Sequence, residues 1–271
     1  MQLTRHSTPT GPRWARDGLF LAESFRLGLL LELSPDFIPP FLDSLAGSEP
    51  ALGPLLAPIE DHQEVWASGV TYKRSREART HESTVKDVYE KVYVANRPEL
   101  FFKSIGVRAV GHGMNIRVRR DSQWNVPEPE LTLVLNRDLE VVGYCAGNDV
   151  SSRDIEGDNP LYLPQAKVYD GSCAIGPAIV LSHEEALTNV PIQLSIRRGG
   201  KSVFEGETTS AEMKRSLREL ASYLGRELSF PQGAFLMTGT GIVPPDGFSL
   251  RAGDVVRVRV AEALLENEVA P

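Results

Sequence analysis

The sequence has few of the features that mark secreted, membrane or nucleic-acid-binding proteins. Cys145 and Cys173 are the only cysteines in 271 residues, which is too few for a disulfide framework. Both lie among small apolar residues, so we expect reduced, buried thiols. No apolar run approaches the roughly 20 residues that span a bilayer. No hydrophobic segment follows the first residues as it does in a secretory signal. These absences predict a cytoplasmic protein.

Positive charge is also scarce. The formal net charge is −7 and the sequence pI is about 5.4, which argues against a general attraction to nucleic acid or anionic membranes. Arg117, Arg119 and Arg120 form a short basic cluster beside apolar residues, and we interpret them as a solvated strand face. The sequence therefore predicts no nucleic-acid partner and no membrane partner.

The composition is that of a chain with a sizeable core. Hydrophobic residues make up 41% of the chain and charged residues 24%, as in ordinary globular proteins. Residues 1–62 contain the apolar stretch Leu19–Leu33 and many prolines. We expect a small N-terminal domain there, followed by a main catalytic domain at residues 63–271.

The main domain is predicted to be rich in strands. Leu131–Leu135 and Glu140–Tyr144 are expected strands on either side of a turn, and the apolar residues of Val255–Val260 alternate as in a half-buried strand. One helix is expected, because Thr209 and Glu212 have capping-box spacing. Its apolar face repeats at Met213, Leu217, Leu220, Ala221 and Leu224. Without βαβ alternation, the pattern predicts an α+β, strand-rich sandwich or roll.

Two glutamates at the entry to a strand are the most informative feature. Glu128 and Glu130 are two residues apart, so in a strand they share a face, and Pro127 and Pro129 brace the backbone between them. Like charges held together repel, and a divalent cation relieves the repulsion. Asp149 offers a third carboxylate, and oxygen ligands favour Mg²⁺, Mn²⁺ or Ca²⁺ over zinc. A solvated strand edge remains the alternative interpretation of the two glutamates.

The run Pro127–Leu131, followed by Asn148–Asp154, resembles the fumarylacetoacetate hydrolase family over roughly residues 65–260. The resemblance implies a mixed β-sandwich roll and a homodimer or homotetramer. It also implies that Glu128, Glu130 and Asp149 bind one Mg²⁺ or Mn²⁺ ion. Further motifs that occur in the same order as in the family are Pro98–Ser104, Gln165–Asp170 and Thr238–Gly241.

One departure from the family pattern bears on the reaction. Hydrolytic members carry a histidine where Ser75 stands here, and serine has no proton affinity near neutrality, so it cannot act as a base. His81, six residues further on, is a weaker candidate for that role. The stretches Tyr72–Arg79 and Glu156–Lys167 resemble the branch of the family that dehydrates 2-dehydro-3-deoxy-D-pentonates of the arabinonate and xylonate type. The expected product is 2,5-dioxopentanoate, formed in oxidative pentose breakdown.

The resemblance to that branch implies an acid–base pair, Glu99 and Lys167. Our working hypothesis is that Lys167, with its pKa lowered near the metal, takes the C3 proton of the 2-oxo sugar acid and Glu99 protonates the departing C4 hydroxyl. The reverse assignment stays open. The residues expected to bind the substrate are Ser75, Phe102, Lys103, Arg153 and Thr240, whereas Arg74, Arg76 and Arg79 are expected on a solvated face.

Besides decarboxylation or isomerisation of 2-oxo acids, which also occurs in the family, two other functions are compatible with the sequence. The nearest is a C–C bond hydrolase of an acylpyruvate or a 2,4-dioxo sugar acid, which would need another base to activate water. The other is a relative without catalytic activity, against which the intact metal and lysine motifs argue.

Overall fold

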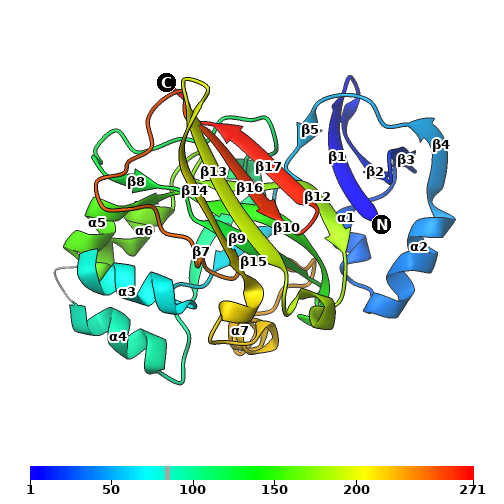
Figure 1. Ribbon diagram of the computed structural model, residues 1–271. Coiled ribbons are helices and arrows are strands. Elements are labelled where there is room, and N and C mark those ends of the chain that lie inside the picture. Colours follow the sequence, from blue (N-terminus) through cyan, green and yellow to red (C-terminus); the bar gives the residue numbers. More distant parts are fainter. Residues whose placement is uncertain (83–85) are drawn as a thin grey trace.

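A large mixed β-sheet is the framework of the computed structural model, which describes residues 1–82 and 86–271 (Figure 1). The side chains of residues 81, 82, 86 and 87 also lie outside that description. In spatial order the sheet comprises β4 (Ala46–Pro50), β3 (Leu19–Leu21), β2 (Gly11–Arg16), β1 (Gln2–Thr8), β12 (Cys173–Leu181), β10 (Val141–Asp149), β9 (Pro129–Leu135), β15 (Ala234–Met237), β6 (Glu64–Ala67) and β7 (Phe101–Ile105), with β5 (Leu55–Leu56) paired to β1. The neighbours are antiparallel except for β15 and β6, which are parallel.

A second sheet of four strands packs over one face of the first (Figure 1). Its order is β14 (Lys201–Thr209), β13 (Pro191–Arg198), β16 (Val255–Val260) and β17 (Ala263–Glu268). Leu131 and Leu133 of β9 share one face of their strand and join Ile192 and Leu194 of β13 in the main buried cluster. The predicted strand-rich α+β sandwich roll is therefore confirmed.

Short helices lie at the two ends of the sandwich. Figure 1 shows α3, α4, α5 and α6 gathered on one side and α1 and α2 beside the N-terminal strands. Their bounds are α1 (Leu27–Leu30), α2 (Ile38–Ser44), α3 (Lys73–Glu82), α4 (Lys86–Val94), α5 (Arg153–Asp158), α6 (Leu163–Lys167) and α7 (Leu217–Leu224). A two-stranded sheet of β8 (Asn125–Val126) and β11 (Ser151–Ser152) lies next to α5. Every helix in the described ranges is too short or too polar to cross a bilayer.

The local predictions for the main domain are largely confirmed. The strand expected at Leu131–Leu135 is β9, and the returning strand is β10, which begins at Val141 and continues to Asp149. The strand expected at Val255–Val260 is β16. Both cysteines are free and buried. The strand interpretation of Arg117–Arg120 is wrong: this segment is a loop, in which Arg119 pairs with Asp121 at 2.6 Å.

The predicted helix is present, but its start was placed seven residues too early. It is α7, whose residues Leu217, Leu220 and Leu224 are buried. The Ser216 hydroxyl accepts the backbone N–H of Glu219 at 3.1 Å, so Ser216 is the capping residue. Thr209 instead ends β14, where it is paired with Pro191 of β13. Thr209 and Ser216 are both followed three residues later by a glutamate, which is capping-box spacing. Because β14 extends to Thr209 in its pairing with β13, the helix begins only after Ser216.

The N-terminal strands extend the large sheet through the pairing of β1 with β12. A second buried cluster on this side joins Leu3 and Leu30 to Val134 of β9. The Glu60 carboxylate accepts the backbone N–H groups of Leu27 at 2.7 Å and Gly28 at 3.2 Å, which fixes the start of α1. The division of the chain at residue 62 stays a prediction.

Candidate metal and acid–base site

Three carboxylates meet where β9 and β10 end side by side. Glu128 precedes β9, Glu130 is its second residue and Asp149 is the last residue of β10. Glu130 is paired with Gly147, and the Asp149 N–H donates to the Glu128 carbonyl at 2.9 Å. All three side chains are buried, and an oxygen from each lies within 4.8 Å of those of the others. The shared strand face expected for Glu128 and Glu130 thus becomes a compact set of oxygen ligands.

The charges around this cluster are unevenly distributed. Burial acts to raise the pKa of Glu128, but the positive charges of Lys167, Arg79 and Arg153 outweigh it and hold that pKa below its usual range. Burial together with the negative charges of Asp149 and Glu128 raises the pKa of Glu130 well above its usual value. The Glu130 carboxyl accepts the Gly239 N–H at 2.5 Å. A bound cation would offset this repulsion, so the donor set fits Mg²⁺ or Mn²⁺.

Two lysines converge on these carboxylates from separate elements. Lys167, the last residue of α6, places Nζ 2.6 Å from a Glu128 oxygen and 3.1 Å from an Asp149 oxygen. Lys103 of β7 is fully buried, with Nζ 2.5 Å from the other Asp149 oxygen and 3.2 Å from the Val150 carbonyl. Lys103 has no exposed surface and contacts Asp149 directly, so its position suits holding the Asp149 carboxylate in place.

Two arginines bind the other side of the cluster. Arg79 of α3 approaches Glu128 at 2.7 Å and also pairs with Glu156 of α5. Arg153, the first residue of α5, approaches the same Glu128 oxygen at 3.0 Å. The interpretation of Arg79 as solvated is wrong, because its side chain is buried between α3, α5 and the carboxylates. Arg153 is also almost fully buried, so it is placed to hold Glu128.

Glu99 enters the site from the segment that precedes β7. Its carbonyl accepts the Ser68 hydroxyl at 2.8 Å, and its carboxylate lies against Gly69, where a Cβ would come within 2.1 Å of an Oε atom. The next residue, Val70, has a φ of 54°, a conformation that is costly for a β-branched residue. Thr71 fixes this loop by donating to the Thr238 carbonyl at 2.7 Å. Gly69 therefore leaves room for the Glu99 carboxylate because it has no side chain. The same loop holds Val70 in a strained backbone conformation.

Replacing Gly69 with alanine is expected to displace the Glu99 carboxylate, because the new methyl group would occupy its place. A catalytic group moved by about 1 Å can lose about a hundredfold in rate. If Glu99 is catalytic, kcat falls by about that factor while KM changes little. Steady-state kinetics of the alanine variant at several pH values would check this. An unchanged kcat would contradict the placement of Glu99 at the reacting atoms.

A cavity is lined by several of these groups, whereas Glu130, Lys103 and Arg153 lie behind its wall. The sequence-predicted residues that line it are Ser75, Glu99, Glu128, Asp149, Lys167 and Thr240. The Ser75 hydroxyl also donates to the Tyr72 carbonyl at 2.8 Å, and the Thr240 hydroxyl bonds the backbone of Ile242 at 3.2 Å. Both residues thus lie at the cavity wall, with their hydroxyls bonded to backbone groups.

Phe102 is placed away from the cavity. Its ring makes an edge contact with Trp66 at 5.9 Å between centroids, whereas Phe101 lines the cavity and lies 5.6 Å from Lys167 Nζ. Phe101 and Lys103 both approach Lys167, so they lie on the same side of β7. The pairing of β7 with β6 shifts register between Phe102 and Ser104, so this shared side follows from the contacts. Phe101 is therefore the aromatic residue at the site.

The sequence interpretation missed two further residues, Arg79 and Glu156, which also line the cavity. A helical pattern could have suggested Arg79, because it lies one turn after Ser75 on the same face of α3. Glu156 lies three residues after Arg153 in α5 in the same way. The side chain of His81 lies outside the description, so its predicted substitution for the missing histidine stays a prediction.

Comparison with known proteins identifies the family. The profile described as fumarylacetoacetate (FAA) hydrolase C-terminal matches residues 64–270. A probable 2-keto-3-deoxyxylonate dehydratase of Haloferax volcanii is 49% identical over 201 residues, covering 74% of this chain and 69% of the relative. A 2-dehydro-3-deoxy-D-arabinonate dehydratase of Saccharolobus solfataricus is 45% identical over 206 residues, with the same two coverages.

A solved structure extends the similarity to the whole chain. It is a 2-keto-3-deoxy-D-arabinonate dehydratase complexed with magnesium and 2,5-dioxopentanoate. Its sequence is 34% identical, the alignment covers 100% of this chain and 99% of that one, and the TM-score is 0.80. The apo form of a 2-keto-3-deoxy-D-arabinonate dehydratase gives a TM-score of 0.85 at the same identity and coverage.

Proposed function

The chain belongs to the fumarylacetoacetate hydrolase family, and on this premise we propose that it is a metal-dependent hydro-lyase. It removes water from a 2-dehydro-3-deoxy-D-pentonate of the arabinonate or xylonate type and yields 2,5-dioxopentanoate. The observation that carries this proposal is one cavity lined by Glu99 and Lys167 beside the buried carboxylate cluster, with Ser75 at its wall. A hydroxyl in that position supports dehydration over hydrolysis, because it cannot activate water as a base.

The cluster is proposed to hold Mg²⁺, with Mn²⁺ or Ca²⁺ as substitutes, through Glu128, Glu130 and Asp149. When bound, the cation supplies the positive charge that stabilises negative charge developing on the 2-oxo group of the substrate. Lys103 and Arg153 hold two of these carboxylates in place from fully buried positions. We therefore assign them a positioning role in place of the direct substrate contact expected from the sequence.

Loss of water requires that a proton leaves C3 and that the C4 hydroxyl leaves as water, followed by rearrangement to the C5 aldehyde. Burial acts to lower the pKa of Lys167, but the negative charges of Asp149, Glu128 and Glu156 outweigh it and raise that pKa above its usual range. A bound cation would offset these charges and favour the neutral amine that a base requires. With the cation in place, we assign removal of the C3 proton to Lys167 and protonation of the departing hydroxyl to Glu99.

Burial raises the pKa of Glu99 to about 7, so a substantial fraction of the molecules carries this proton at neutral pH. Ser75, Thr240 and Phe101, which line the same cavity, are proposed to contact the substrate.

Three further features belong to this proposal. The protein acts on its small-molecule substrate as a homodimer or homotetramer, and it works in the cytoplasm, where its two free cysteines would stay reduced. Residues 1–62 form a small N-terminal domain attached to the catalytic domain at residues 63–271. The start of the matched family region at Glu64 supports that boundary.

A direct assay tests the reaction. Incubation with Mg²⁺ and 2-dehydro-3-deoxy-D-arabinonate is expected to form an aldehyde at C5, and EDTA is expected to abolish its formation. Proton NMR detects the aldehyde and its hydrate apart from the 2-oxo group that the substrate already carries. Pyruvate formed from an acylpyruvate, without aldehyde from the pentonate, would identify a hydrolase instead. A protein without catalytic activity would give neither product and would not respond to EDTA.

A further inference from the structure

The outer face of the four-stranded sheet points away from the larger sheet (Figure 1) and lies outside the cavity described above. In β13 the apolar residues Ile192, Leu194 and Ile196 are buried against the core, so Gln193 and Ser195 point outward. A shallow groove of about 510 Å³ runs over this face. Because the outward residues are polar or charged, a partner that binds this face must carry opposite charges at the facing positions.

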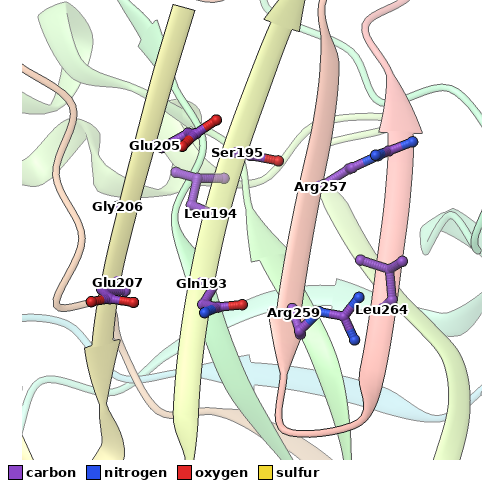
Figure 2. Close-up of a pocket in the computed structure, with 9 residues that line it drawn as sticks. All are labelled: Gln193, Leu194, Ser195, Glu205, Gly206, Glu207, Arg257, Arg259 and Leu264. Carbon is purple, nitrogen blue, oxygen red and sulfur yellow. The ribbon is translucent and has the colours of Figure 1, made fainter. Parts of the chain in front are cut away.

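The charges on this face are separated by strand. Figure 2 shows Glu205 and Glu207 on β14 at one side of β13 and Arg257 and Arg259 on β16 at the other. The strand register aligns them in rows across the sheet. Glu205 and Arg257 both pair with Ser195, and Glu207 and Arg259 both pair with Gln193. Beyond β16, the first row continues to Glu266 of β17 and the second row to Leu264. The second row is therefore acidic on one side of β13 and basic on the other.

The two charges of a row lie two strand spacings apart, roughly 10 Å between backbones, with the β13 residue between them. In the described part of the chain, neither Glu207 nor Arg259 has an ion-pair partner, and both are exposed. Arg257 pairs with Glu266 of β17, and Glu205 accepts the Ser202 hydroxyl. The row of Glu207 and Arg259 thus offers one free charge of each sign.

We propose that this face binds a second copy of the chain, with a twofold axis parallel to β13. When the axis lies over β13, rotation by 180° exchanges the strands on its two sides and keeps each residue at the same height along the strands. It places β14 of one copy over β16 of the other. Glu207 then faces Arg259 of the partner subunit, and the same pair forms a second time, as a twofold interface requires.

Charge also decides the direction of the axis. An axis in the plane between the sheets but perpendicular to the strands would place β14 over β14 and β16 over β16. Like charges would then face each other, which disfavours association. Sheets that pack face to face keep their strands roughly aligned, which both axes satisfy, so the charges alone favour the parallel axis. This inference rests on the proposed homo-oligomer and locates its interface.

Charge reversal tests the interface. Glu207→Arg and Arg259→Glu each place like charges at both symmetry-related contacts, so each is expected to raise the dimer dissociation constant on the order of tenfold or more. The double variant Glu207→Arg/Arg259→Glu restores opposite charges and is expected to recover the wild-type dissociation constant. Sedimentation velocity over a range of protein concentrations, at low and high salt, measures each value.

The control is Glu227→Arg, the same change at an exposed glutamate after α7, which is expected to leave the dissociation constant unchanged. A monomeric wild-type protein, single variants that dimerise normally, or a double variant that stays as weak as the singles would each overturn the proposal. Aldehyde formation from the pentonate is measured on the same samples. Its absence in the wild type would refute the enzyme activity without bearing on the interface.

Discussion

Substituting Glu130 with glutamine is expected to lower kcat/KM by more than about a hundredfold. Loss of a residue that only hydrogen-bonds to a metal ligand already lowers metal affinity or activity by about 10–100-fold, and Glu130 is proposed to be a ligand itself. The change removes one charge from the three-carboxylate cluster and keeps an oxygen that can accept the Gly239 N–H. Titration of the protein with Mg²⁺ and Mn²⁺ by calorimetry is expected to show a matching loss of affinity. The control, Glu227→Gln, alters an exposed glutamate and is expected to leave affinity and activity unchanged.

Thermal unfolding separates this loss from a folding defect. Without metal, the Glu130 carboxyl is disfavoured as an anion by burial and by Asp149 and Glu128, so glutamine removes an unfavourable charge. The variant's Tm in EDTA is therefore expected to equal or exceed that of the wild type. Mg²⁺ is expected to raise the Tm of the wild type only. A variant that still binds Mg²⁺ with wild-type affinity would contradict the assignment of Glu130 as a ligand.

The backbone geometry of this site was predictable because it follows from strand periodicity. Glu128 and Glu130 are two residues apart at the start of β9 and meet Asp149 at the end of β10, as antiparallel pairing of consecutive strands requires. The choice of Phe101 over Phe102 was not predictable by this rule, because the pairing of β7 with β6 shifts register at Lys103. The prediction that the two glutamates share a face needed only the alternation of side chains along a strand, which can be read from the sequence.

The surroundings of the carboxylates were not predictable in the same way. Arg79 is buried because α3 packs beside α5 and brings Glu156 next to it. Lys103 and Lys167 are 64 residues apart and meet only because α6 packs against β7. Such contacts depend on how elements pack, which a single sequence does not encode locally. The position of the cap of α7 was likewise decided by the β13–β14 register.

Glu99 is the group for which the environment matters most to the chemistry. Burial raises its pKa to about 7, and the charge of Glu156 acts in the same direction. Arg79 and Lys167 act to lower this pKa, while Glu128 acts to raise it. A divalent cation at the carboxylates would add positive charge and lower the pKa of Glu99 further. In the metal-loaded protein its midpoint is therefore expected at or below about 7.

Substituting Glu99 with glutamine is expected to lower kcat on the order of 10²- to 10⁴-fold, which is the usual contribution of one acid–base group. If Glu99 donates the proton to the departing C4 hydroxyl, only its protonated form is active. Wild-type kcat then falls as the pH rises through the Glu99 midpoint, and the residual activity of the variant loses that dependence. Glutamine keeps the shape of the side chain against Gly69, so its effect reports the proton and not the packing.

The pH profile also decides between the two assignments. A wild-type kcat that rises through the same range would make the ionised Glu99 the base at C3 and reverse the roles proposed here. Solvent exchange at C3, followed by NMR in D₂O, provides an independent measurement. If Lys167 is the base, Lys167→Ala loses this exchange while Glu99→Gln retains it, because protonating the C4 hydroxyl is not needed to remove the C3 proton. Exchange at the wild-type rate in Lys167→Ala would exclude Lys167 as the base.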